Sequence, residues 1–282
     1  MNDFQLIATD CQVQVATVPT IAETLFLHLF RGALGRILGE SASKEALAGQ
    51  PCPFDPPCAF DWMHNSQGTQ DGRPLPKPFV LRLDRGESSS VITMRLFGWA
   101  AQWRHVILNA MVMACRRGVD LRKGQKQTKT DARLPLEVLA VGISDVNIPA
   151  VPATDQIRLN FETPLVLRTK ALSAVKAGAT VQPEHVIEPL LTGLALRLSG
   201  LAKWHQTQLG TVSPNQHITI KQASLRGAFA DRGPQRKRAG CTGSITLSNA
   251  SNEQIELLSY ASVIHAGSDT VIGTGRMTLT RA

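Results

Sequence analysis

The chain has little of what several protein classes require. Its 282 residues contain only five cysteines, an odd number spread along the chain, and this argues against a disulfide framework. No apolar run approaches the roughly 18 residues of a membrane-spanning helix. The start, Met1-Asn2-Asp3-Phe4, lacks the basic and apolar regions of a signal peptide. We therefore expect a soluble, cytoplasmic protein with reduced cysteines and no membrane partner.

Aromatic and acidic residues are also scarce. Phe, Trp and Tyr make up 5% of the chain, with a single tyrosine, and most of them stand at apolar positions of expected helices or strands. Proteins that bind single strands usually stack bases on exposed aromatic rings. The net charge of +8 and the pI of about 9.6 favour a polyanionic partner. Together these features favour recognition of the backbone and shape of a duplex, such as the stem of an RNA hairpin.

The apolar pattern predicts the same order of elements twice, strand, helix, strand, strand, helix, strand. This is the ferredoxin-like order. We predict an α+β fold of two tandem ferredoxin-like (RRM-like) βαββαβ domains, residues 1–150 and 151–282, divided at the proline-rich stretch Pro149 to Pro152. The expected elements are strand 4–16, helix 21–38, strands 78–84 and 90–97, helix 98–117 and strand 134–146, then strand 156–169, helix 184–209, strands 217–225 and 241–247, helix 252–266 and strand 277–279.

Residues 41–77 are rich in Pro, Gly, Asp and Asn, which predicts a long loop insertion in the first domain. Cys52, Cys58 and His64 lie within it at a C-x5-C-x5-H spacing. Structural zinc sites use four ligands at tight paired spacings, so a structural loop is the stronger interpretation. A zinc-dependent nucleic-acid-binding protein stays open as a weaker hypothesis.

Basic residues gather in two segments at expected connections between elements. Each segment is typical of a solvated surface loop when taken alone, but two of them on a basic chain favour binding of RNA phosphates. The candidate RNA-binding residues are Arg116, Arg117, Arg122, Lys123, Lys126 and Lys129 in the first segment, and Arg226, Arg232, Arg236, Lys237 and Arg238 in the second.

A glycine-rich loop, residues 267–275, precedes the last expected strand. Glycines at such a joint are often only a turn, but they also let another backbone approach closely. A run of exposed N–H groups in the loop would receive phosphate oxygens. Gly267, Ser268, Gly273 and Gly275 are therefore further candidate RNA-binding residues.

These features together resemble a known family. They are the order of elements, the run Arg31-Gly32-Ala33-Leu34-Gly35-Arg36, the basic segment that ends at Gly240-Cys241-Thr242-Gly243-Ser244, and the glycine-rich loop. The chain resembles a CRISPR RNA-processing endoribonuclease of the repeat-associated mysterious protein (RAMP) superfamily. The likeness is clearest from Asn160 onward. Ser268 stands where the family often has lysine, and in such departures the chain is similar to divergent members from type IV systems.

The resemblance implies metal-independent cleavage of precursor CRISPR RNA within its repeat, without a cofactor. A ribose 2′-hydroxyl would attack the adjacent phosphate and leave a 2′,3′-cyclic phosphate. His28 matches the histidine that the family often uses as a base or acid. Its neighbours Leu27 and Leu29 are equally consistent with a core histidine. Arg31 and Arg36 would hold the scissile phosphate, since a guanidinium cannot act as a base at neutral pH.

The partners that the resemblance implies are a CRISPR repeat RNA hairpin and other CRISPR effector subunits. An alternative function follows from the shortage of acid and base candidates. In that alternative the chain is a non-catalytic RNA-binding subunit of a CRISPR effector complex.

Overall fold

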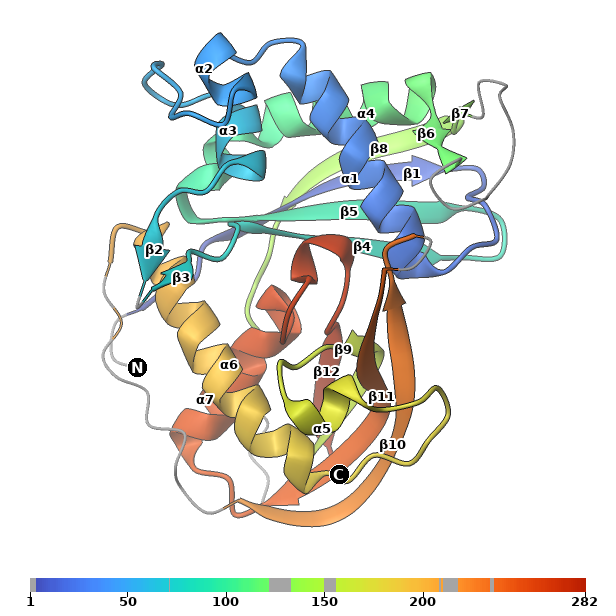
Figure 1. The fold of residues 1–282 in the computed structure, drawn as a ribbon, viewed down its shortest axis with the longest axis vertical. Coiled ribbons are helices and arrows are strands. Elements are labelled where there is room, and N and C mark those ends of the chain that lie inside the picture. The colour runs from blue at the N-terminus through green and yellow to red at the C-terminus, as the bar shows by residue number, and fades with distance from the viewer. Residues whose placement is uncertain are drawn as a thin grey trace. The chain divides into compact units, whose positions relative to one another are not determined.

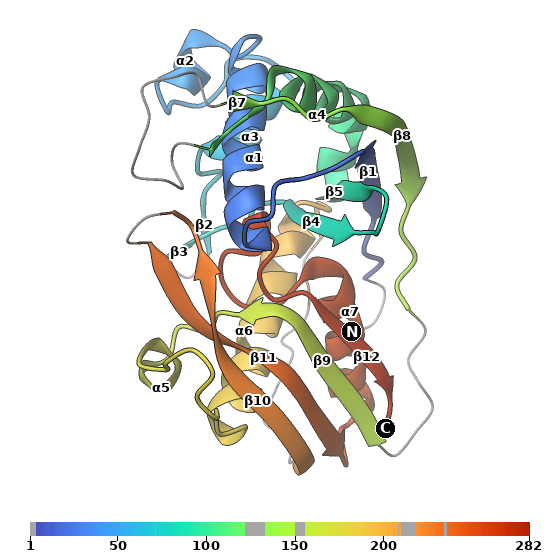
Figure 2. The ribbon, with the colours of Figure 1, turned by 90° about the vertical axis from the view of Figure 1, so that its right-hand side faces the viewer.

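The computed structural model describes residues 4–70, 72–121, 133–149, 156–207, 209, 218–233 and 236–282. They form two compact units. The N-terminal unit runs from Ile7 to Val146, and the C-terminal unit runs from Asn147 to Ala282 and includes the described residues before Ile7. Each unit has one four-stranded antiparallel sheet with helices packed against it (Figures 1 and 2). No helix in the described part of the chain combines the length and apolar character needed to cross a bilayer.

The N-terminal unit has the strand order β4-β5-β1-β8. When the four strands of this sheet are numbered in chain order, the spatial order is 2-3-1-4. This order, with two helices that connect the strands, confirms the predicted ferredoxin-like arrangement. Its main elements are β1 (Ala8–Val15), α1 (Glu23–Gly39), β4 (Phe79–Arg85), β5 (Ser90–Phe97), the 3-10 helix η1 (Gly98–Trp103), α4 (Arg104–Arg117) and β8 (Val138–Asp145).

The C-terminal unit repeats this topology with the order β10-β11-β9-β12. Helix α7 begins at a capping box, in which Ser251 and Gln254 satisfy each other's backbone N–H groups. The main elements are β9 (Gln156–Leu165), α5 (Lys170–Ser173), α6 (Glu184–Lys203), β10 (Thr219–Asp231), β11 (Lys237–Ser248), α7 (Asn252–Ile264), the 3-10 helix η3 (Thr270–Ile272) and β12 (Met277–Arg281).

Alternation along the strands separates a core face from an open face of each sheet. In β1, Cys11 and Val13 are fully buried, and the Cys11 thiol donates to the carbonyl oxygen of Arg104 in α4. Asp10 and Gln12, which alternate with them along the strand, must then lie on the face turned away from the helices, here named the open face.

The stretch 41–77, predicted to be a long loop insertion, folds in part into regular structure. Trp62 and Met63 are fully buried and anchor a short helix, because apolar burial outweighs the surrounding prolines and glycines. The elements of this stretch are α2 (Lys44–Leu47), α3 (Ala59–His64), β2 (Thr69–Gln70) and β3 (Arg73–Pro74). A second two-residue pair joins β6 (Val119–Asp120) to β7 (Arg133–Leu134).

The prediction that the basic segment 226–238 is a connection between strands was wrong for most of its length. Residues up to Asp231 continue β10, and β11 already begins at Lys237. The alternation of buried Leu225 with exposed Arg226 is a strand pattern that the high charge concealed. The basic side chains of this segment are therefore carried mainly by a long, paired β-hairpin.

Candidate functional site

Helix α1 carries the three residues that were predicted to be catalytic. His28 and Arg31 are half-buried, and Arg36 is exposed. His28 and Arg31 are one turn apart and lie on the same side of the helix. Arg36 lies about 12 Å further along the helix axis than His28. The three residues thus lie on one rigid helix, but Arg36 is too far along it to share a compact cluster with His28 and Arg31.

Both arginines of α1 donate to carbonyl groups near the C-termini of other helices. Nη2 of Arg31 lies 3.5 Å from the Met63 carbonyl oxygen in α3, and Nη2 of Arg36 lies 3.4 Å from that of Gly118, which caps α4. A cation at the negative end of a helix dipole is stabilising. Each arginine therefore has a structural role, although one such contact does not exhaust the five donors of the exposed Arg36.

A second titratable pair, His64 and Lys77, lies beside Arg31. Nζ of Lys77 donates to the carbonyl oxygen of Trp62 at 3.0 Å and to that of Asn65. Burial, followed by the positive charges of Arg31 and Lys77, lowers the pKa of His64 to about 4. Burial, followed by the charge of Arg31, lowers the pKa of Lys77 to about 8. No local sequence motif joins residues so far apart in the chain, so the cluster was not predicted.

The His64 ring is packed rather than open. It stacks on Phe60 with ring centroids 4.8 Å apart, and a Cβ atom built on Gly35 would lie 2.6 Å from its Nε2. Gly35 thus lets α3 approach α1 closely. The cluster of Arg31, His64 and Lys77 is primarily a junction between α1 and α3, and its cations hold the end of α3.

The first group of predicted RNA-binding residues is described only in part. Arg116 and Arg117 are exposed in the last turn of α4, and Arg117 forms an ion pair with Glu40. The contact between Arg36 and Gly118 places the end of α1 beside them. Arg122, Lys123, Lys126 and Lys129 lie outside the described residues. The described part is thus an exposed basic patch at the end of α4.

The second group and the glycine-rich loop, far apart in the sequence, meet in the C-terminal unit. The carboxylate of Asp269 lies 3.4 Å from Nη1 of Arg232 and 3.2 Å from Nε of Arg238. Arg236 and Lys237 are exposed at the hairpin end. Asp269, the single acidic residue of 267–275, was missed as a functional candidate. Arg226 lies further along β10, where its Nη1 donates to Thr180 Oγ1 at 3.0 Å.

The glycine-rich loop is more enclosed than the sequence suggested. Gly273 and Gly275 are buried, and Gly267 and Ser268 are half-buried. The N–H group of Ser268 donates to Val166 and that of Gly275 to Pro164, at 2.8 and 3.0 Å. The idea of a run of exposed amides does not hold for these two residues, because β9 and the segment after it already use their N–H groups. The loop is better described as a rigid support for side chains, especially that of Asp269.

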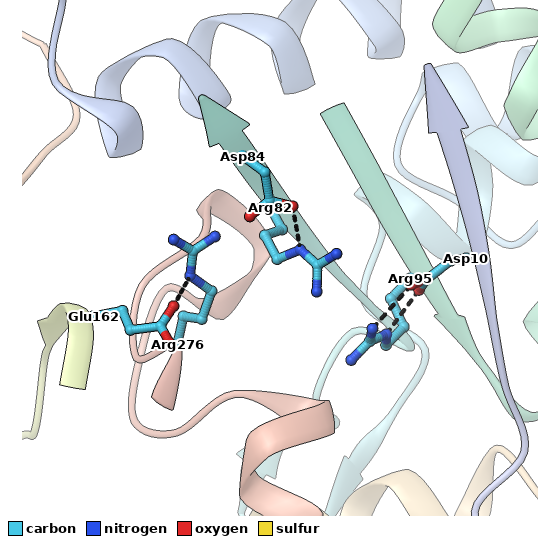
Figure 3. Close-up of polar contacts among 6 residues, drawn as sticks. All are labelled: Asp10, Arg82, Asp84, Arg95, Glu162 and Arg276. Carbon is cyan, nitrogen blue, oxygen red and sulfur yellow. Dashed lines mark hydrogen bonds and ion pairs between the residues drawn. The ribbon is translucent and has the colours of Figure 1, made fainter. Parts of the chain in front are cut away.

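Two arginines that were not predicted as site residues form ion pairs to neighbouring strands (Figure 3). Arg95 of β5 makes a buried bidentate pair with Asp10 of β1, with N–O distances of 2.7 and 2.9 Å. Arg276, directly after the glycine-rich loop, pairs with Glu162 of β9 at 2.7 Å. The second contact ties the end of the loop to the sheet.

The cysteines show no metal-binding arrangement among the described residues, where no three Cys, His, Asp or Glu side chains gather. Sγ of Cys52 accepts from the backbone N–H of Cys58, while the His64 ring packs on Phe60. Burial raises the pKa of Cys11 and of Cys115 to about 12, so these thiols are protonated at neutral pH. The structure lends no support to the zinc hypothesis.

Comparison with solved structures places the fold among the Cas6 proteins. A Cas6 product complex shares 16% identity and a TM-score of 0.56, covering 97% of this chain and 99% of that chain. A second Cas6 product complex shares 17% identity, also with a TM-score of 0.56, covering 98% and 100%. A Cas6 of Thermus thermophilus shares 13% identity and a TM-score of 0.53, covering 98% and 100%. No curated protein matches the chain.

The chain therefore shares the tandem ferredoxin-like fold of these Cas6 structures. Residues 159–277 match the family described as CRISPR-associated endoribonuclease Cas6. A second family, described as an N-terminal domain, matches residues 26–135. Residues 159–277 thus carry a Cas6 endoribonuclease domain, in agreement with the resemblance noted in the sequence.

Proposed function

We propose that this endoribonuclease cleaves precursor CRISPR RNA within the repeat, without a metal ion, through attack by a ribose 2′-hydroxyl. The observation that carries the proposal is the match of residues 159–277 to the Cas6 family. In the proposed step the O2′–P bond forms and the P–O5′ bond breaks. A base takes the proton of the 2′-hydroxyl and an acid protonates the leaving 5′-oxygen. The products are a 2′,3′-cyclic phosphate and a 5′-hydroxyl.

His28 is the residue that we assign to proton transfer, as base or acid. It is half-buried on a long helix whose apolar side holds it firmly, and a rigid element is a suitable carrier for a catalytic group. Gly32 follows one turn later and is exposed, and a Cβ atom built on it would meet nothing within 4 Å. The backbone of α1 is therefore open beside His28, which gives an RNA backbone room to approach.

We assign Arg31 and Arg36 to the phosphate. Positive groups placed near a pentavalent phosphorane stabilise the charge that develops on its oxygens. The contacts of the two arginines with Met63 and Gly118 restrict their positions, and such restriction lowers the entropy lost on binding. Arg31→Ala is expected to lower cleavage by about two to four powers of ten, as is His28→Ala, without loss of RNA affinity.

The basic residues of both units are proposed to bind the repeat hairpin through its phosphates. Those described in the structure are Arg116, Arg117, Arg226, Arg232, Arg236, Lys237 and Arg238, with the loop residues Gly267, Ser268, Gly273 and Gly275 as support. We also propose that the protein works with other CRISPR effector subunits and that it comes from a type IV system.

A non-catalytic RNA-binding subunit is the second candidate function. It is favoured by the structural use of both α1 arginines, whose guanidinium groups donate to main-chain carbonyls. If those contacts are their whole role, the chain binds RNA without cutting it.

One experiment separates the two functions. The purified protein is incubated in EDTA with its own repeat RNA and with a matched RNA that carries a 2′-deoxy nucleotide at the cut site. Cleavage of the first RNA alone, with a 3′ end that resists phosphatase until acid opens the cyclic ester, is the expected result. Binding of both without cleavage would instead support the non-catalytic subunit. Cleavage that requires added metal would overturn the proposed chemistry.

A further inference from the structure

We propose that Asp269 is a positioning residue that holds Arg232 and Arg238 together so that the pair binds one phosphate of the RNA. The inference rests on the proposed RNA-binding function and adds to it a residue of the opposite charge. Arg232 directly follows β10, and Arg238 lies in β11 opposite Ala230. The two arginines thus flank the end of one hairpin, and the carboxylate of Asp269 lies near both.

The backbone fixes the carboxylate in this place. Asp269 has a φ of +63°, a left-handed conformation that Asp and Asn adopt more readily than most residues. Its carbonyl oxygen accepts a hydrogen bond from the N–H group of Ile272 at 2.9 Å. The N–H group of the preceding Ser268 donates to the carbonyl oxygen of Val166. The Asp269 side chain is 16% exposed, against 30% for Arg232 and 42% for Arg238. The anion is therefore the enclosed member of the group and the cations are the members that reach solvent.

The ion pairs leave the arginines able to bind a ligand. Charge-assisted N–H···O bonds are usually about 2.7–2.9 Å long, and the two distances to Asp269, 3.4 and 3.2 Å, are longer. Each guanidinium has five donors, and its planar fork matches a phosphate. Two guanidinium groups would repel each other without an anion near both. Asp269 offsets that repulsion while the group of three keeps a net positive charge.

If Asp269 positions the two arginines, Asp269→Asn should change the affinity for RNA in the direction opposite to the one expected from net charge alone. Removing a carboxylate raises the net charge by one, from +8 to +9, and this alone should tighten binding to RNA. Loss of positioning should weaken it. Asn also tolerates the left-handed conformation, so the loop should keep its shape.

The test measures binding to a repeat RNA hairpin with a 2′-deoxy nucleotide at the cut site, so that cleavage does not interfere. We expect Asp269→Asn to weaken binding about tenfold and to lower the salt slope by about one phosphate contact. Glu188→Gln is the matched control, because Glu188 is an exposed carboxylate of α6 and its loss changes the net charge equally. Asp269→Glu, which keeps the charge, should recover part of the affinity.

A double-mutant cycle provides a second test if Asp269→Asn does not fold. Arg232→Gln and Arg238→Gln together should weaken binding less than the product of their separate effects, because both act on one phosphate. Strictly independent effects would overturn the proposal. So would an affinity of Asp269→Asn equal to or higher than that of Glu188→Gln. If wild-type protein neither binds nor cleaves its repeat RNA, the proposed function fails as well, whereas normal wild-type activity with an unaffected Asp269→Asn removes this inference alone.

Discussion

The two units have one topology but use arginine differently on the open faces of their sheets. Arg95, on the central strand β5, is buried and makes a bidentate pair with Asp10 (Figure 3). Arg158 lies on β9, also a central strand, but it is exposed and donates to Ser244 at 3.0 Å. On the open face of the N-terminal unit the arginine is thus buried in an ion pair that stabilises the sheet. On the open face of the C-terminal unit the arginine is exposed beside a hydroxyl group, so the fold alone does not assign a role to a face.

The same contrast applies to the connections. In the N-terminal unit the described arginines of α1 hold the ends of other helices. In the C-terminal unit the arginines of the β10–β11 hairpin are grouped around a carboxylate of the glycine-rich loop. Within the proposed function we infer a division of labour, in which the N-terminal unit supplies a rigid helix for the chemistry and the C-terminal unit adds a phosphate site to the basic patch at the end of α4.

The largest expected effect compares the two open-face arginines. Arg95→Met leaves Asp10 as an unpaired buried charge and should lower the free energy of unfolding by about 3–5 kcal/mol. Arg158→Met removes an exposed contact and should cost less than about 1 kcal/mol. Urea unfolding is followed by tryptophan fluorescence, because Trp62, Trp99 and Trp103 report on the N-terminal unit and Trp204 reports on the C-terminal unit.

A control for this comparison replaces both partners of the buried pair. Asp10→Leu combined with Arg95→Met should recover most of the lost stability, since an apolar pair replaces the ion pair without leaving a buried charge. Equal losses for Arg95→Met and Arg158→Met would show that the two faces do not differ as described.

An effect of intermediate size concerns pH and the junction of α1 with α3. Burial lowers the pKa of folded His64 to about 4, against 6.5 for the free residue. The unfolded chain therefore binds more protons between these values, and stability is lost as the pH falls from about 6.5 to 4, by about 2–3 kcal/mol from this residue. His64→Gln should flatten this part of the stability profile. His185→Gln, at an exposed position of α6, is the matched change in the other unit, and an equal flattening there would contradict the assignment.

The smallest expected effect compares two glycines within helices. Gly32 of α1 and Gly193 of α6 both have nothing within 4 Å of a built Cβ atom. Replacement of either by Ala should raise stability by about 0.5–1 kcal/mol. Gly32→Ala should also slow RNA cleavage about tenfold if the RNA approaches α1 beside His28. Gly193→Ala should leave cleavage unchanged, and identical rates for the two variants would remove Gly32 from the site.

The sequence predicted the fold where the apolar pattern was regular. Strand β5 was predicted with its observed ends, and the apolar spacing of α1 located that helix to within two residues at its start. The prediction failed where charged residues or prolines obscured the pattern of buried and exposed positions. Arg226 and its neighbours were taken for a connection although they lie on paired strands, and the buried Trp62 was assigned to a loop.

The candidate site was less predictable than the fold, because its contacts join distant parts of the chain. His28, Arg31 and Arg36 could be grouped on one helix because helical spacing is local. No local signal connects Asp269 with Arg232 and Arg238, since their meeting depends on how the hairpin packs against the loop. Lys77 was missed for the same reason, because its partners are main-chain carbonyl groups at the C-terminal end of α3.

The most direct test of the division of labour is a single-turnover measurement of the cleavage rate and RNA affinity of two variants, one from each unit. His28→Ala should lose two to four powers of ten in rate, a loss of about 3–5 kcal/mol of transition-state stabilisation, and keep its affinity. Arg238→Ala should lose affinity but cleave near the wild-type rate once the protein is saturating. Wild-type cleavage by His28→Ala, or a rate lost by Arg238→Ala even at saturation, would contradict the account.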